Sequence, residues 1–196
     1  VEYGGMGVPA IAGLLAFAQV NRACISSATQ LGFYTSIIDM IERFCEKEDR
    51  DRLIPKIVAG EMSGSMCLTE PGAGSDLAGL KTKAVLEGDT WIINGQKIWT
   101  SGAHYCDYGI LVTRSDPSAQ KHKGLTYFFI DMKSPGVECR PIKQISGGAN
   151  FNEVYFTDVK IPDEQRLGAV GDGWRVALTT LMNERLAVGD ASGPAF

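Results

Sequence analysis

The sequence predicts an α+β protein: a helical segment, a β-barrel-like middle domain of short antiparallel strands, and the start of a C-terminal helical bundle. Three patterns along the 196 residues indicate this order. Apolar residues recur at helical spacing up to about Glu61, and short β-rich runs divided by turn residues extend from Ser63 to about Gly168. Helical spacing returns after 171–173. Regular short strands favour a sandwich or barrel over a parallel α/β sheet. We expect domain boundaries at 1–62, 63–171 and 172–196.

The first region contains a clear amphipathic helix. Four residues spaced i, i+4, i+7 and i+8 share one helical face: Ile37, Ile41, Phe44 and Cys45. The charged stretch 46–52 is interpreted as the solvated start of a further helix. Gly60 is a residue type that commonly ends a helix, so we expect this second helix to stop there.

The middle region contains several strand and turn signals. Asn94-Gly95 stands between the short β-rich runs 91–93 and 96–99 and can supply the positive φ of a tight turn, so the sequence predicts a β-hairpin there. Turns are also expected at Pro135-Gly136 and Gly147-Gly148. Further strands are expected at Ile110–Val112, Tyr127–Ile130 and Val154–Phe156.

The last region predicts one helix, from Trp174 to at least Val188. Its apolar stripe at helical spacing consists of Trp174, Ala177, Leu181 and Val188. Because the chain stops at Phe196 with this helix barely complete, we expect it to be a fragment of a larger protein.

Composition excludes several classes of function. The formal net charge of −4 argues against nucleic acid or an anionic membrane surface as the main partner. No apolar stretch approaches the roughly 20 residues of a transmembrane helix. Five widely spaced cysteines without a CxxC pair indicate free thiols in a reducing compartment. Acidic and cysteine residues do not make a ligand set around His104 and His122, the only two histidines, so we expect no metal site.

The segment 67–76, Cys-Leu-Thr-Glu-Pro-Gly-Ala-Gly-Ser-Asp, is the most informative part of the chain. Two glycines and several hydroxyl and carboxyl groups allow a backbone to approach a ligand closely, with N–H groups free to face anionic oxygens. An ordinary turn between strands would have a similar composition. The segment lacks the third glycine of a dinucleotide-binding fingerprint. We expect Glu70 and Asp76 to accept backbone hydrogen bonds that hold the loop.

This segment resembles the signature of the acyl-CoA dehydrogenase family, and the resemblance extends over nearly the whole chain. The sequence at 2–7 is similar to an early loop of the family, and 94–102 is similar to its second flavin-binding strand. The sequence at 156–162 resembles the last strand of the family's β-domain, and 171–174 resembles the opening of its long C-terminal helix. Together with the signature segment, these four ordered motifs at compatible spacing carry the resemblance.

The resemblance implies a bound FAD and places residues around it. Met66, Leu68 and Thr69 match positions that touch the flavin ring and its polar edge. Gly74 and Ser75 match the loop near the cofactor, and Ser75 also matches a contact to the acyl-CoA. The segment 99–101 matches the second part of the cofactor site: Trp99 packed on the isoalloxazine, Thr100 beside it, and Ser101 near flavin N5, where the family more often has threonine. From the residues alone, a tryptophan on a strand is more often part of the core than a cofactor platform.

Glu184 is the candidate catalytic base. It falls on the apolar stripe of the last helix, where desolvation raises the pKa of a carboxyl and suits it to act as a base near neutral pH. The structural alternative is a carboxylate paired with Arg185 or with a partner chain. By the resemblance, Glu184 matches the position of the base in the isovaleryl and long-chain enzymes, and Arg185 matches a residue that contacts CoA. Other members carry the base much further along the chain, so both locations stay open.

The function implied is α,β-dehydrogenation of an acyl-CoA thioester to a trans-2-enoyl-CoA in fatty-acid β-oxidation, with hydride transfer to FAD. The resemblance further implies electron-transferring flavoprotein as electron acceptor, a homodimer or homotetramer, and the bacterial cytoplasm or the mitochondrial matrix as location. We expect the chain by itself to be a poor enzyme or none. The alternatives are an acyl-CoA oxidase, a flavin monooxygenase of the same fold, and a non-catalytic CoA-binding or scaffold protein.

Overall fold

The computed structural model describes the backbone of residues 2–189 and the side chains of residues 2–9 and 11–182. The chain divides into two compact units, which are described separately. One unit joins residues 1–61 with the chain from 178 onward, and the other comprises 62–177. Helix α4 (Gly173–Gly189) begins in the second unit and ends in the first, and it confirms the helix expected after Gly173.

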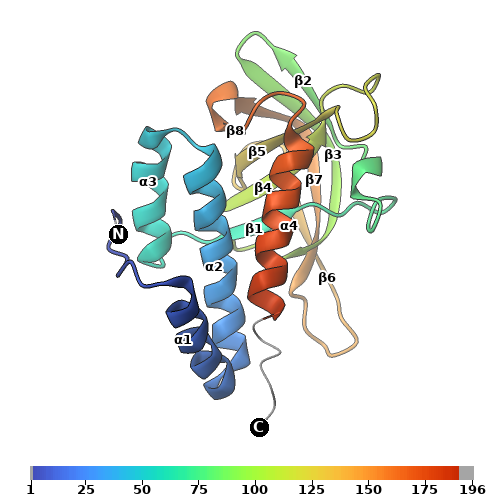
Figure 1. Ribbon diagram of the computed structural model, residues 1–196. Helices are drawn as coiled ribbons and strands as arrows, with labels where there is room; N and C mark the ends of the chain where they lie inside the picture. The colour runs from blue at the N-terminus through green and yellow to red at the C-terminus, as the bar shows by residue number, and fades with distance from the viewer. Residues whose placement is uncertain (1, 190–196) are drawn as a thin grey trace. The chain divides into compact units, whose positions relative to one another are not determined.

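The first unit contains three consecutive helices, α1 (Ala10–Ala23), α2 (Ile25–Phe44) and α3 (Lys47–Val58). Helix α2 contacts both of its neighbours, as Figure 1 shows. The amphipathic face expected from the sequence belongs to α2, where Ile37 and Ile41 are buried. Gly60 has φ +73°, a left-handed conformation that ends a helix readily, so the predicted stop is confirmed. In the part of the chain that the structure describes, no helix is both long and apolar enough to cross a bilayer.

The second unit is built on an eight-stranded sheet (Figure 1). The strand order is β6-β7-β3-β2-β4-β5-β8, with β1 paired to β4 off this path. The strands are β1 (Gly64–Cys67), β2 (Lys83–Glu87), β3 (Thr90–Ser101), β4 (Tyr108–Arg114), β5 (Leu125–Asp131), β6 (Val137–Ile142), β7 (Phe151–Pro162) and β8 (Arg166–Leu167). The α+β prediction is confirmed. Most neighbouring strands pair antiparallel, as expected, but the sheet is mixed, because β4 pairs parallel with β1 and with β2.

The strands expected around Ile110, Phe128 and Tyr155 are confirmed as β4, β5 and β7. Their inward side chains join those of β3 in the core of the unit. Trp91 and Phe128 pack edge to face there, with ring centroids 5.3 Å apart. The connections at Pro135-Gly136 and Gly147-Gly148 also occur where the sequence predicted them, between β5 and β6 and between β6 and β7.

The predicted hairpin at Asn94-Gly95 is wrong, because β3 runs straight through this dipeptide. A Cβ on Gly95 would lie 2.6 Å from Cα of Thr82, so glycine here permits a close approach of two backbones rather than a reversal of the chain. Asn94 and Asp158 exchange two hydrogen bonds across the strands, at 2.9 and 3.0 Å. The actual turn lies earlier, at Gly88 with φ +62°, between β2 and β3.

Candidate functional site

The glycine-rich segment 67–76 leaves strand β1 and closes into a tight loop. The N–H of Glu70 donates to the carbonyl of Ala73 at 3.0 Å, and the N–H of Ala73 donates to the carbonyl of Glu70 at 3.1 Å. Gly74 and Ser75 follow this closed turn and are exposed. The loop therefore presents small, accessible residues on a fixed backbone, an arrangement suited to close contact with a ligand.

The two carboxylates of the loop have different partners. Glu70 accepts hydrogen bonds from the backbone N–H groups of Lys81 at 2.6 Å and Thr82 at 2.9 Å, so the predicted backbone role is confirmed for Glu70. For Asp76 the expectation is wrong: its carboxylate pairs with the ammonium of Lys121 at 2.5 Å. This exposed ion pair links the signature loop to the connection between β4 and β5.

Trp99 lies at an irregularity of strand β3. The pairing of β3 with β7 changes register between Lys97 and Thr100, and Trp99 has φ +60°. Positive φ is rare for a non-glycine residue, and a bulge of this kind redirects a side chain. The indole is 55% exposed and contacts Phe151 only edge-on, at 6.2 Å between ring centroids. The chain thus displays a large aromatic ring on the surface of a rigid strand, rather than burying it in the core.

Two hydrogen bonds to backbone carbonyls hold the signature loop against this part of β3. The N–H of Ile98 donates to the carbonyl of Thr69 at 2.8 Å, and the ammonium of Lys97 donates to the carbonyl of Leu68 at 3.0 Å. The structure therefore brings together, within one unit, the two segments that carry all the cofactor residues inferred from the resemblance. These residues are Met66, Leu68, Thr69, Gly74, Ser75, Trp99, Thr100 and Ser101. Among them, Leu68 and Thr100 are buried, Met66 and Thr69 are half-buried, and the others are exposed.

Glu184 and Arg185 lie within the helical backbone of α4. Their side chains fall outside the residues whose side chains the structure describes, so the proposed catalytic base and CoA contact stay predictions. The two histidines have local partners instead. His104 shares a hydrogen bond of 3.0 Å with Asn152, and the ring of His122 lies 4.5 Å from that of Trp174.

Lys97 is the feature of this region that the sequence argument missed. Its side chain has no solvent exposure, and its ammonium lies 2.9 Å from the carboxylate of Glu70, which is 7% exposed. One signal for it exists in the sequence, because Lys97 shares the period-2 face of Trp91 and Ile93, both of which are buried. The assumed hairpin at Gly95 interrupted that pattern.

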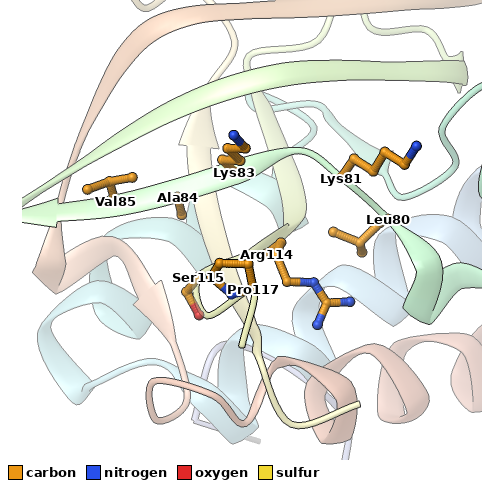
Figure 2. Close-up of a pocket in the computed structure, with 8 residues that line it drawn as sticks. All are labelled: Leu80, Lys81, Lys83, Ala84, Val85, Arg114, Ser115 and Pro117. Atoms are coloured by element: carbon orange, nitrogen blue, oxygen red, sulfur yellow. The ribbon is translucent and has the colours of Figure 1, made fainter. Parts of the chain in front are cut away.

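A separate pocket of about 510 Å³ lies beside strand β2 and contains none of the predicted site residues. Figure 2 shows its lining, in which the ammonium groups of Lys81 and Lys83 and the guanidinium of Arg114 point in different directions. Arg114 already donates to the carbonyls of Ala78 and Lys121.

Comparison with known proteins identifies the family of the chain. A family model described as "Acyl-CoA dehydrogenase, middle domain" matches residues 65–159, and the corresponding N-terminal domain model matches residues 1–61. The chain belongs to the acyl-CoA dehydrogenase family. The resemblance drawn from the sequence motifs is therefore confirmed.

Individual members of the acyl-CoA dehydrogenase family show how much of the enzyme this chain represents. It is 51% identical to acyl-CoA dehydrogenase FadE34 of Mycobacterium tuberculosis over 149 residues, covering 76% of this chain and 21% of that protein. It is 38% identical to FadE29 of the same organism over 191 residues, covering 97% of this chain and 49% of that protein. A chain of the ChsE4-ChsE5 complex from Mycobacterium tuberculosis superposes with a TM-score of 0.81 at 34% identity, covering 94% of this chain and 47% of that chain. The chain thus spans about half the length, or less, of these relatives.

Proposed function

We propose that the full protein is an acyl-CoA dehydrogenase that converts an acyl-CoA thioester to a trans-2-enoyl-CoA. The observation that carries the proposal is Trp99, an exposed indole on a left-handed bulge beside the signature loop. A structural tryptophan would be buried, and a left-handed backbone is unfavourable for a large residue. Both costs are accounted for if the ring serves as a platform for a flat ligand.

The residues of this region fit FAD, the cofactor that the acyl-CoA dehydrogenase family uses. Trp99 offers a face for the ring system, while the exposed Ser101 offers a hydroxyl close to it in the chain. Met66 lies on β1, and Leu68 and Thr69 lie in the loop that follows it, hydrogen-bonded to the part of β3 that precedes Trp99. We assign Thr100 a place in the same wall and Gly74 and Ser75 to the edge nearest the CoA arm.

The proposed reaction needs three contributions from the protein. A base must remove the α-proton of the thioester, and we assign this role to Glu184, with Arg185 contacting CoA. Hydrogen bonds to the thioester carbonyl must stabilise the negative charge that develops on it. The loop and Trp99 must orient the flavin and the α- and β-carbons of the thioester relative to each other, because correct orientation of the reactants contributes much of an enzyme's rate enhancement. FAD, when bound, supplies the redox chemistry by accepting the β-hydrogen as hydride.

An acyl-CoA oxidase or a flavin monooxygenase of the same fold would use similar residues. The speed at which the reduced protein reacts with oxygen separates these from a dehydrogenase, which reacts slowly. We propose electron-transferring flavoprotein as the acceptor and a homodimer or homotetramer as the assembly. A relative in this family is described as a complex of two different chains, ChsE4 and ChsE5. The bacterial cytoplasm and the mitochondrial matrix both suit such an enzyme.

The proposal is tested by adding acyl-CoAs of different chain length and branching to the purified full protein under anaerobic conditions. We expect flavin absorbance in the visible range to bleach with one class of thioester, which would identify both the half-reaction and the substrate class. A protein that carries no flavin and takes up none would support a CoA-binding or scaffold role instead.

Replacing Glu184 with glutamine is expected to slow anaerobic bleaching roughly 10²–10⁴-fold, the usual contribution of a general base. Flavin content and acyl-CoA binding should stay unchanged, since glutamine has nearly the same shape. The exposed Glu164 provides the matched control, and E164Q should bleach at the normal rate. An unaltered rate in E184Q would move the base to another part of the full protein.

A further inference from the structure

A buried ion pair joins the signature loop to strand β3, the two segments of the proposed site. The ammonium of Lys97 lies 2.9 Å from Oε1 of Glu70, and neither side chain is more than 7% exposed. The other hydrogen bonds of this pair are made to backbone groups of two separate segments. Glu70 accepts from the N–H groups of Lys81 and Thr82, and Lys97 donates to the carbonyl of Leu68. The pair therefore joins β3, the approach to β2 and the signature loop at one point.

Stability alone is a poor explanation for this arrangement. Removing two charges from water is costly, and replacing a buried pair with apolar residues of similar volume is often neutral or stabilising. Burial lowers the pKa of Lys97, and the carboxylate of Glu70 opposes that shift. The pair thus lies in the protein interior and belongs to the two segments to which the cofactor is assigned.

The geometry of the Leu68–Thr69 peptide group suggests what the ion pair does. The carbonyl of Leu68 and the N–H of Thr69 belong to the same planar trans peptide group, so they point in opposite directions. Because Lys97 holds the Leu68 carbonyl inward, the Thr69 N–H must point away from Lys97. Across residues 2–189, this N–H has no hydrogen-bond acceptor, whereas the Thr69 carbonyl on the next peptide accepts from Ile98. Lys97 is also the last residue of β3 before the register shift that carries Trp99.

We propose that Lys97 and Glu70 form a positioning pair, which orients the Leu68–Thr69 peptide so that the Thr69 N–H is presented to the flavin. The inference rests on the proposed function, since it requires a flavin in this site. Neither residue touches the reacting atoms. The pair acts through the loop backbone, whose direction it fixes before the cofactor binds, and it holds that backbone at a set distance from the Trp99 bulge.

The experiment compares K97M, E70Q and the double variant K97M/E70Q in the full protein, because a glutamine at position 70 is neutral but can still accept from the N–H groups of Lys81 and Thr82. Each is measured for apoprotein melting temperature, for FAD affinity by fluorescence titration of the apoprotein, and for the absorption and circular dichroism of the bound flavin. Removing one partner of a buried pair is strongly destabilising, so K97M should melt at a lower temperature. The double variant leaves no uncompensated charge and should recover most of that loss. It is therefore the decisive variant if K97M does not fold.

If the pair positions the loop, K97M/E70Q folds but binds FAD roughly tenfold more weakly, the worth of about one hydrogen bond, and its flavin spectrum is shifted. A double variant with unchanged FAD affinity and spectrum would reduce the pair to a structural role and overturn the inference. The exposed pair Lys133–Asp107, at 2.6 Å in the same unit, supplies the control: K133M should alter none of the three measurements. A wild-type protein that binds no FAD contradicts the proposed function, an outcome distinct from these.

Discussion

Replacing Gly136 with alanine is expected to destabilise the protein by roughly 2–5 kcal/mol. Gly136 has φ +90° in the turn between β5 and β6, and a Cβ there would lie 2.2 Å from the carbonyl oxygen of Thr157 in β7. Two costs combine. A left-handed backbone costs an L-residue about 1–2 kcal/mol, and forcing a methyl group against a packed backbone costs about 1–3 kcal/mol more. The N–H of Thr157 donates to the carbonyl of Gly136, so movement to relieve the clash would also strain this bond.

Gly147 is the matched control for this substitution. It occupies the next turn of the same sheet at φ +88°, but a Cβ at this position meets nothing within 4 Å. Thermal unfolding of the full protein should therefore show a loss of only about 1–2 kcal/mol for G147A, the backbone cost alone. The difference between the two variants measures the clash. Equal losses would mean that β6 and β7 separate easily at this turn and that the sheet edge is softer than its close packing indicates.

The sequence predicted the order of helical and β-rich regions correctly because each depends on local periodicity. The face of α2 follows from the spacing of Ile37 and Ile41, and β5 follows from an apolar run around Phe128. Such patterns can be recognised without knowing which element packs against the helix or strand, since a buried face must be apolar whatever covers it. The pairing of strands does not have this property. The parallel contacts of β4 with β1 and β2 join segments that local patterns cannot match.

The incorrect prediction of a hairpin at Asn94-Gly95 also affected the prediction of the site. Asn-Gly is a strong signal for a tight reversal, but at Gly95 the absence of a Cβ allows close contact with Thr82 instead. Dividing β3 there separated Lys97 from the buried face it shares with Trp91 and Ile93. A lysine in a short hairpin arm is expected to be solvated, whereas a lysine at an inward position of a long strand requires a buried counter-charge. A continuous β3 would therefore have predicted a buried carboxylate partner for Lys97, which in the structure is Glu70.

The direction of the Trp99 side chain could not be predicted from the sequence pattern either. Alternation along β3 cannot give its direction, because the register shift between Lys97 and Thr100 breaks the alternation at this point. The family resemblance assigned Trp99 to the flavin, but the reason for its exposure is visible only in the fold. Sequence patterns fail to predict the conformation of residues such as Trp99, whose proposed role in a site opposes their local conformational preference.

That conflict between local preference and the proposed role gives the last prediction. Trp99→Gly should weaken FAD binding roughly 10–100-fold, since stacking on an aromatic side chain contributes about 1–3 kcal/mol per ring system. The apoprotein should nevertheless be as stable as the wild type or more so. Glycine adopts φ +60° freely, which removes about 1–2 kcal/mol of backbone strain, and the exposed indole has few packing contacts to lose.

Two companion variants separate the contributions. W99A removes the ring but keeps the strain, so W99G and W99A should bind FAD alike, while the W99G apoprotein melts at a higher temperature. W99F keeps an aromatic face and should retain most of the affinity. Fluorescence titration with FAD and calorimetry of the apoprotein provide the two measurements. If W99G instead lost the 3–5 kcal/mol typical of a truncated core aromatic while FAD affinity stayed normal, Trp99 would be a structural residue. The opposite pattern, weaker binding in a more stable apoprotein, is difficult to obtain unless the backbone at Trp99 is strained in order to display the ring to a ligand.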